Sequence, residues 1–281
     1  MTSAVLFPGQ GSQTPDMRDL VARVRPDLLE VAASALGEDP FAHVGEGSRF
    51  DQPAILIASL AGWEALGRPS GVAFAGHSLG EISALVAAGA IGERDGVDLV
   101  ATRGRLMDDA PAGGMLALLG GDLDAARTLA ERHGLVVAND NSPGQVVLAG
   151  PVEALDPAAG DAKAVGARAA RRLPVACAFH SPLMASAEEP FARALDAIEV
   201  RAPRLPVFSC ATAAPFDDVR AGLVAALTAP VRWREIVLAL RGLGAERFVE
   251  VGPGKVLAGL VKRTLDDPEL VTLDSALAAH G

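Results

Sequence analysis

The sequence predicts an α/β fold in which a parallel-rich sheet is interrupted by an inserted lobe. Apolar strands alternate with helix-patterned segments on both sides of residues 110–184, as is typical of parallel sheets. Within that range the expected order changes to βαββαβ, which is typical of a ferredoxin-like unit. We therefore expect a large subdomain from residues 1–109 and 185–281, and a small ferredoxin-like subdomain from residues 110–184.

The first part of the large subdomain begins as a strand, a loop and a helix. Residues 3–7 are apolar and end at Pro8 in a glycine-flanked loop, and apolar positions recur at helical spacing over residues 16–36. The elements expected next are a helix (52–66), a buried strand (72–76), an Ala-rich helix (81–91) and a further helix (95–110).

The lobe and the remainder of the chain follow the same reasoning. In the lobe we expect a strand (115–121), a helix (123–134), a strand pair (135–150) and a final helix–strand unit within ARAARRLPVACAF (167–179). The large subdomain then resumes with a helix (186–198), a strand (206–210), two helices (219–227 and 232–243), a strand (247–252) and a glycine-capped helix from residue 254.

Composition excludes several classes of protein. The formal net charge of -10 disfavours nucleic acid and anionic membranes as partners. Two cysteines, Cys177 and Cys210, are too few for a disulfide framework or a Cys-based zinc site, so we expect both to be buried and neither a metal nor a cofactor to be bound. Residues 1–10 lack a secretory pattern and no apolar run reaches membrane-spanning length, so we expect a cytoplasmic protein. We also expect it to be a monomer.

The stretch GHSLG (76–80) lies between an expected strand and an expected helix. In a GxSxG elbow the glycines permit a tight turn that exposes the serine hydroxyl, and the following amide faces a developing oxyanion. The pattern therefore indicates that Ser78 is a nucleophile. In the simpler alternative, the glycines mark an ordinary turn and the serine caps the helix.

A nucleophilic serine needs a base, which is normally histidine. His77 adjoins Ser78 on the elbow, so we expect its side chain to pack or to orient the turn. Elimination favours His180, which follows the apolar stretch PVACAF (174–179), interpreted as a strand; a purely structural histidine is the alternative. An acidic residue or a backbone carbonyl could orient its other ring nitrogen. The other histidines lie in a loop, a polar helix and the terminal tail: His43, His133 and His280.

Six blocks of sequence, in the same order from end to end, resemble the malonyl-CoA:acyl carrier protein transacylases, a family that includes the acyltransferase domains of polyketide synthases. The blocks are FPGQGSQ (7–13), GHSLGE (76–81), TRGRLM (102–107), NDNSPGQVVLAG (139–150), AFHSPLM (178–184) and EVGPGKVL (250–257). The resemblance implies an α/β-hydrolase-like large subdomain. It also implies transfer of malonyl from coenzyme A to the phosphopantetheine thiol of an acyl carrier protein, in fatty acid or polyketide biosynthesis.

The same resemblance assigns roles to residues. It makes Ser78 the acylated nucleophile and His180 the base and later the acid. Gln10 and the amide of Leu79 would form the oxyanion hole. Two departures from the family pattern affect the site. The segment before residue 51 is shorter than usual, which concerns the mouth of the cleft. Ala226 stands where a polar residue is common, close to the carbonyl expected to orient the histidine.

The substrate pocket implied by the resemblance contains Arg103, Phe179 and His77. A buried guanidinium pairs with a carboxylate in a two-pronged way, and an acetyl group would leave that charge unpaired, so arginine favours a dicarboxylic acyl group. Phe179 would leave no room for an α-methyl branch, which favours malonyl over methylmalonyl. Without the resemblance, Arg103 reads as a surface arginine balanced by Asp108 or Asp109.

The carrier protein would dock on local positive charge, because both partners are acidic. The most compact basic cluster is Arg168, Arg171 and Arg172, which could equally be a solvated helix face. Two other functions stay open on the sequence. One is an editing hydrolase of the same architecture that removes stray acyl groups, and the other is a silent scaffold that only binds carrier proteins.

Overall fold

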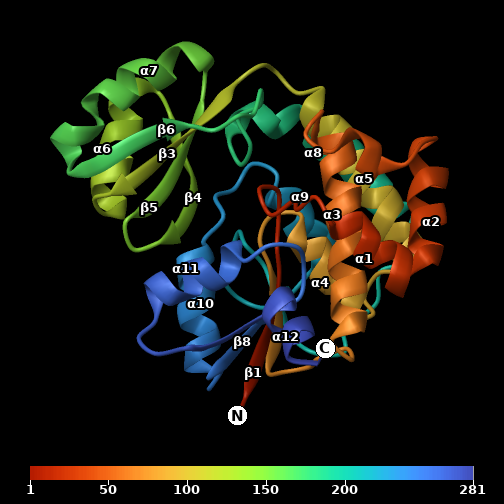
Figure 1. Cartoon of the computed structure of the whole chain (residues 1–281). Coiled ribbons are helices and arrows are strands. Elements are labelled where there is room, and N and C mark those ends of the chain that lie inside the picture. Colours follow the sequence, from red (N-terminus) through yellow and green to blue (C-terminus); the bar gives the residue numbers. More distant parts are fainter. Residues whose placement is uncertain (281) are drawn as a thin grey trace.

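Two separate sheets organise the chain, each with its own helices (Figure 1). The computed structural model describes residues 1–280, and side chains through residue 278. The parallel sheet has the order β7-β2-β1-β8-β9 and the antiparallel sheet the order β4-β5-β3-β6, which confirms the predicted α/β class. The parallel strands are β1 (Ser3–Phe7), β2 (Ala73–Gly76), β7 (Val207–Phe208), β8 (Arg247–Glu250) and β9 (Glu269–Thr272).

Helices cover both faces of the parallel sheet, because its central strand is apolar at every position after the first. Val5 and Phe7 on β1 join one hydrophobic cluster, whereas Ala4 and Leu6 join another on the opposite face. This alternation follows from the two-residue repeat of a strand. The helices outside the lobe are α1 (Met17–Val24), α2 (Pro26–Leu36), α3 (Ser48–Ala65), α4 (Gly80–Ala87), α5 (Glu93–Asp108), α8 (Ala185–Asp196), α9 (Val219–Ala225), α10 (Trp233–Gly242), α11 (Val256–Thr264) and α12 (Leu273–His280).

The antiparallel sheet lies at the upper left of Figure 1, with two helices packed on one face. A third hydrophobic cluster, separate from the two of the parallel sheet, joins these helices to the strands. The elements of this lobe are β3 (Gly114–Gly120), α6 (Leu123–His133), β4 (Val136–Ser142), β5 (Gln145–Gly150), α7 (Val152–Asp161) and β6 (Ala167–Arg172). Short 3-10 turns occur at Pro40–His43, Ala162–Val165 and Pro182–Met184.

The last unit of the lobe differs from the prediction. The expected helix over ARAARR is instead strand β6, and its antiparallel pairing with β3 outweighs the helix preference of alanine and arginine. The expected strand before His180 is absent, because Pro174 interrupts the pairing and the chain leaves the sheet as the connection 173–180. That connection runs beside the outgoing one, where the Gly113 amide donates to the Ala176 carbonyl at 3.1 Å.

Three further differences are smaller. The helix expected over 16–36 is two helices, α1 and α2, separated at Arg25 with Pro26 starting the second. Strand β9 and helix α12, at the end of the chain, were not expected from the sequence.

Among residues 1–280, no helix combines the length and the apolar character needed to cross a membrane.

Candidate active site

Ser78 lies on the tight turn between β2 and α4, as the GxSxG pattern predicts. Its φ of 54° is in the left-handed region, which is unusual for a residue other than glycine. The flanking glycines allow this turn to pack closely on strand β1: a Cβ at Gly80 would lie 2.2 Å from the Phe7 carbonyl oxygen, and one at Gly76 only 1.8 Å from the Gly80 backbone. Only glycine fits at either position.

His180 meets Ser78 from the connection that returns from the small lobe. The Ser78 hydroxyl donates to Nε2 of His180 at 2.8 Å, and Nδ1 donates to the carbonyl oxygens of Ala226 and Ala229 at 2.8 and 3.2 Å. Main-chain carbonyls, rather than an acidic side chain, therefore orient the ring, so a side chain lacking a polar group at position 226 is no obstacle. Burial, with smaller contributions from Arg103 and His77, lowers the pKa of His180 to about 3.

Arg103 comes from α5 and is buried, so the surface reading of this residue is wrong. Its Nη1 donates to Oε1 of Gln52 at 2.8 Å and its Nη2 donates to the Ser78 hydroxyl at 3.1 Å. Asp108, the partner considered for it on the sequence, instead accepts from backbone amides at the start of α3. Burial lowers the pKa of Arg103 to about 10, which leaves the side chain positive at neutral pH.

Gln52 connects Arg103 to Gln10. It accepts from the guanidinium, and its own Nε2 donates to Oε1 of Gln10 at 3.2 Å. Gln10 also donates toward Ser48 and Asp51. Gln52 was not singled out from the sequence, although a glutamine directly before the apolar run of α3 is a signal, because buried amides need partners.

Glu81 is a second residue that sequence reasoning missed. It lies on α4, it is 1% exposed, and it accepts from the Cys210 amide at 2.6 Å. Burial raises its pKa to about 7, and Arg103 opposes that rise. A glutamate in an otherwise apolar, Ala-rich helix was the available signal. Both cysteines are buried, as expected.

His77 points away from the Ser78 hydroxyl and toward the small lobe. Its Nε2 donates to Oδ1 of Asn141 on β4 at 2.9 Å, and its ring packs on Trp233. Leu79, the residue after Ser78, precedes the first turn of α4, so its amide belongs to the positive end of that helix. Other histidines are remote: His43 pairs with Glu38 and Glu46, His133 pairs with Asp161, and the side chain of His280 lies outside the described residues.

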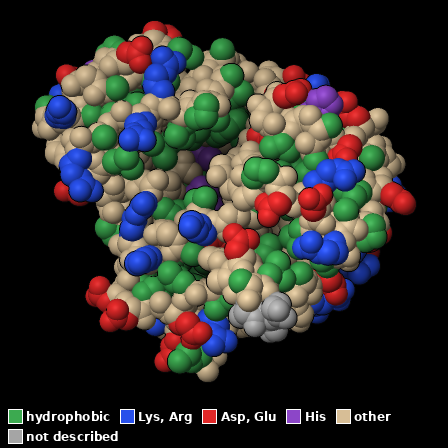
Figure 2. Space-filling model, viewed as in Figure 1, with side chains coloured by type: hydrophobic (Ala, Val, Ile, Leu, Met, Phe, Trp, Pro, Cys, Tyr) green, Lys and Arg blue, Asp and Glu red, His purple; other side chains and the backbone are tan. Residues whose placement is uncertain are grey.

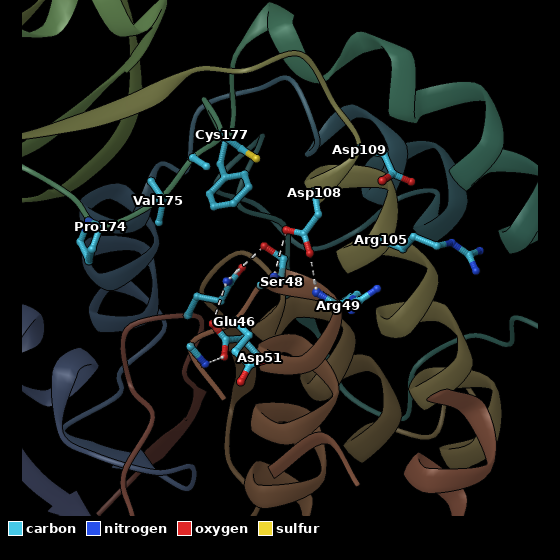
Figure 3. Close-up of a pocket in the computed structure, with 15 residues that line it drawn as sticks. Glu46, Ser48, Arg49, Asp51, Arg105, Asp108, Asp109, Pro174, Val175 and Cys177 are labelled. Carbon is cyan, nitrogen blue, oxygen red and sulfur yellow. Dashed lines mark hydrogen bonds between the residues drawn. The ribbon is translucent and has the colours of Figure 1, made fainter. Parts of the chain in front are cut away.

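A groove between the two lobes gives access to this site, and histidine side chains are visible at its floor (Figure 2). Next to it is a cavity of about 430 Å³, lined by Gln10 and Phe179 together with residues from α3, α5 and the 173–180 connection (Figure 3). Residues 45–48, from the shortened segment, form part of its wall. Within residues 1–280 no cluster of three or more His, Cys, Asp or Glu side chains is arranged to hold a metal.

The fold and the site together define an α/β enzyme that uses a serine activated by a hydrogen-bonded histidine. Residues 49–278 match the family model of the acyl transferase domain, so the chain belongs to this family of acyltransferases.

Within this family, the chain is similar to proteins whose names state an activity or a pathway. The chain is 40% identical to the malonyl CoA-acyl carrier protein transacylase of Escherichia coli K12, over 98% of this chain and 97% of that protein. It is also 40% identical to the polyketide biosynthesis protein ThaF of Burkholderia thailandensis, over 93% of this chain, and the match spans only 24% of ThaF. A solved malonyl-transacylase, in complex with a type II polyketide synthase acyl carrier protein, superposes with a TM-score of 0.91 at 34% identity, covering 99% of this chain and 100% of that one.

Proposed function

We propose that the protein transfers a malonyl group from coenzyme A to the phosphopantetheine thiol of an acyl carrier protein. The observation that carries this proposal is the convergence of three side chains: the Ser78 hydroxyl lies 2.8 Å from Nε2 of His180 and 3.1 Å from Nη2 of Arg103. A nucleophile, its base and a carboxylate-binding cation thus share one crevice. Two of the relatives named above support it, because the Escherichia coli protein is a malonyl CoA-acyl carrier protein transacylase by name and the solved neighbour is a malonyl-transacylase in complex with an acyl carrier protein.

In the first half-reaction Ser78 attacks the thioester carbonyl of malonyl-CoA. Nε2 of His180 takes the hydroxyl proton, and the carbonyl oxygen becomes an oxyanion that accepts from the Leu79 amide and Gln10. When the C–S bond breaks, the imidazolium returns its proton to the departing CoA thiolate. The malonyl group remains as an ester on Ser78.

The second half-reaction reverses these steps with a different thiol. The phosphopantetheine thiol gives its proton to His180 and attacks the ester, and the C–O bond to Ser78 breaks as the serine regains a proton. Free CoA leaves before the carrier protein binds, so ping-pong kinetics follow.

Selection among acyl groups rests on Arg103 and Phe179. Arg103 has hydrogen bonds to Gln52 and Ser78 but none to a carboxylate among the described residues, and the nearby buried Glu81 has a pKa of about 7. A malonyl carboxylate can therefore form the direct, two-pronged ion pair that Arg103 lacks. Phe179 adjoins His180, is 9% exposed and lines the cavity with Gln10. Its ring excludes an α-methyl branch, which disfavours methylmalonyl by about 1–3 kcal/mol.

The proposal is tested by intact mass spectrometry after incubation with malonyl-, methylmalonyl- and acetyl-CoA. We expect a malonyl adduct that is lost in Ser78→Ala and removed by carrier protein bearing its thiol. Ser83→Ala is the matched control, because Ser83 is also a buried serine, one turn along α4, with no hydrogen-bond partner for its Oγ. Retention of the adduct in Ser78→Ala would exclude Ser78 as nucleophile, and faster release to water than to the carrier would indicate an editing hydrolase.

A further inference from the structure

Strand β4 of the small lobe is joined to a loop of the large lobe that follows α9. The Val231 amide donates to the Ala138 carbonyl at 2.8 Å, and the Asp140 amide donates to the Val231 carbonyl at 2.9 Å. Asn139 and Val231 thereby form an isolated parallel bridge. The loop is held against the edge of the antiparallel sheet as if it were a one-residue strand.

An ion pair reinforces this junction. The Arg234 guanidinium donates to Asp140 through Nε, at 3.2 and 2.9 Å from the two carboxylate oxygens, and its Nη2 lies 2.9 Å from Oδ2. The Asp140 side chain is only 6% exposed, so it depends on this partner, whereas Arg234 is 33% exposed. The adjacent Arg232 is already paired with Glu235, which leaves Arg234 to cross between lobes.

The loop fixed in this way contains a group that orients His180. The Ala229 carbonyl, which accepts from Nδ1 of His180 at 3.2 Å, lies two residues before Val231, and the Ala226 carbonyl lies at the end of α9 just upstream. Any shift of residues 229–231 therefore moves at least one acceptor of the imidazole.

The next residue of the same strand contacts the other half of the site. Asn141 accepts from Nε2 of His77, which directly precedes Ser78. Strand β4 thus supports the serine elbow through Asn141 and the histidine-orienting loop through Asp140. The two supports are adjacent in sequence, so the register of one strand sets both.

We propose that Asp140 and Arg234 are positioning residues for acyl transfer: their ion pair holds the 226–231 loop against β4 and so keeps His180 aligned on Ser78. Neither residue contacts the reacting atoms. The inference rests on the proposed function, because it assigns the pair to formation of the seryl ester.

The test measures the rate of Ser78 acylation by malonyl-CoA in Asp140→Asn, Arg234→Gln and the double variant, using quenched-flow intact mass spectrometry. Misplacement of a catalytic group by about 1 Å can cost up to about 100-fold, so we expect each single variant to acylate about tenfold more slowly. The concentration of malonyl-CoA giving half the maximal rate should change less than about twofold, because Arg103 is untouched. The double variant should lose no more than the slower single variant.

Asp27→Asn is the matched control, since it breaks another two-pronged Arg–Asp pair, with Arg25, far along the chain from the junction. It should acylate at the wild-type rate. Thermal unfolding checks the fold, and Arg234→Gln, at the more exposed partner, is the variant expected to fold normally. Wild-type rates in both single variants, or additive losses in the double variant, would overturn the inference. Failure of the wild-type protein to form the ester would instead overturn the proposed function.

Discussion

Ser78 and His180 are 102 residues apart in sequence, and both have left-handed backbones, with φ of 54° and 57°. Such a conformation costs a residue with a Cβ about 1–2 kcal/mol, so the surrounding structure must enforce it. Gly80 packed on Phe7 does so for the elbow. For His180, the hydroxyl of the next residue, Ser181, donates to the Ala178 carbonyl at 2.6 Å and closes the turn. Strain at both positions directs the two side chains into one crevice.

The low pKa of His180 predicts an unusually broad pH range for acylation. A base must be neutral, and burial lowers the pKa of His180 to about 3, so the imidazole stays neutral well below pH 6.5. We expect the acylation rate to change less than about twofold between pH 7 and 5, whereas an imidazole with the ordinary pKa of about 6.5 would lose about 25-fold. Rapid-quench kinetics with malonyl-CoA measures the acylation rate at each pH.

Two variants distinguish the titration of His180 from that of neighbouring groups in the pH dependence of the acylation rate. Glu81, whose pKa is about 7, is removed as a titrating group in Glu81→Gln, and the profile should stay flat there. Arg103 lowers the pKa of His180, so Arg103→Gln should raise that pKa. With acetyl-CoA as the substrate, the fall in acylation rate at low pH should then begin at a higher pH than in the wild-type protein. A limb near pH 6.5 in the wild-type protein would contradict the prediction. Because the folded pKa lies below the unfolded one, His180 also makes stability fall as the pH drops below about 6.5.

Arg103 is predicted to decide between malonyl and acetyl groups. In Arg103→Gln the malonyl carboxylate loses its buried partner, so kcat/KM for malonyl-CoA should fall about 100- to 1000-fold, equivalent to about 3–4 kcal/mol. The value for acetyl-CoA should fall far less. Arg94→Gln, at an exposed arginine of the same helix, is the control and should leave both values unchanged. Equal losses for the two substrates would assign Arg103 to the fold rather than to selectivity.

The elbow glycines are predicted to be intolerant of a single methyl group. In Gly80→Ala the added Cβ would lie 2.2 Å from the Phe7 carbonyl oxygen. The carbonyl belongs to the backbone of β1 and the position of the Cβ is fixed by the backbone of α4, so neither atom can move without shifting packed backbone. We expect a loss of at least about 3 kcal/mol in the free energy of unfolding. In Gly160→Ala, on helix α7, no atom lies within 4 Å of the new Cβ, and stability should rise by up to about 1 kcal/mol. Urea titration measures both, and similar values would show that the close contact relaxes.

The sequence predicted most of the parallel sheet and of its helices because their patterns are local. The residues of β1 after Ser3 and those of β2 carry no polar side chain, and the long apolar run of α3 is typical of a buried helix. The GxSxG turn was equally local, since its glycines are required by contacts within a few residues and with β1. Elimination among five histidines also pointed to His180, which the structure brings to Ser78.

Features set by long-range contacts were missed. Strand β6 has a helix-favouring composition, and only its pairing with β3 makes it a strand. No sequence pattern shows that Gln52 bonds to Arg103, or that Arg234 reaches Asp140 from 94 positions away. The residues themselves left a backbone carbonyl and an acidic side chain as alternatives for orienting His180, because a main-chain acceptor has no residue type; the structure selects the carbonyls of Ala226 and Ala229.

The basic cluster assigned to carrier docking lies on strand β6, not on a helix face. Arg168, Arg171 and Arg172 are exposed on this edge strand, and among the side chains described through residue 278 only Arg172 of the three forms an ion pair, with Asp156 at 3.3 Å. Positive side chains on an edge strand also discourage pairing with strands of other molecules. If this protection were their only role, removing the charges would cause the protein to associate and would not weaken carrier docking. Light scattering separates the two: loss of protection gives association, whereas loss of docking leaves the size unchanged.

For Arg171→Glu/Arg172→Glu we expect the KM for carrier protein to rise about tenfold, while acylation by malonyl-CoA, which needs no carrier, stays at the wild-type rate. The difference should shrink above about 0.3 M salt, because screening weakens contacts between exposed charges. Arg18→Glu/Arg23→Glu is the matched control: it reverses two exposed charges on α1, so the change in net charge is identical. An equal rise in KM for both variants would mean that net charge, rather than the β6 surface, governs the encounter, and an unchanged KM in the β6 variant would exclude this surface as the docking site.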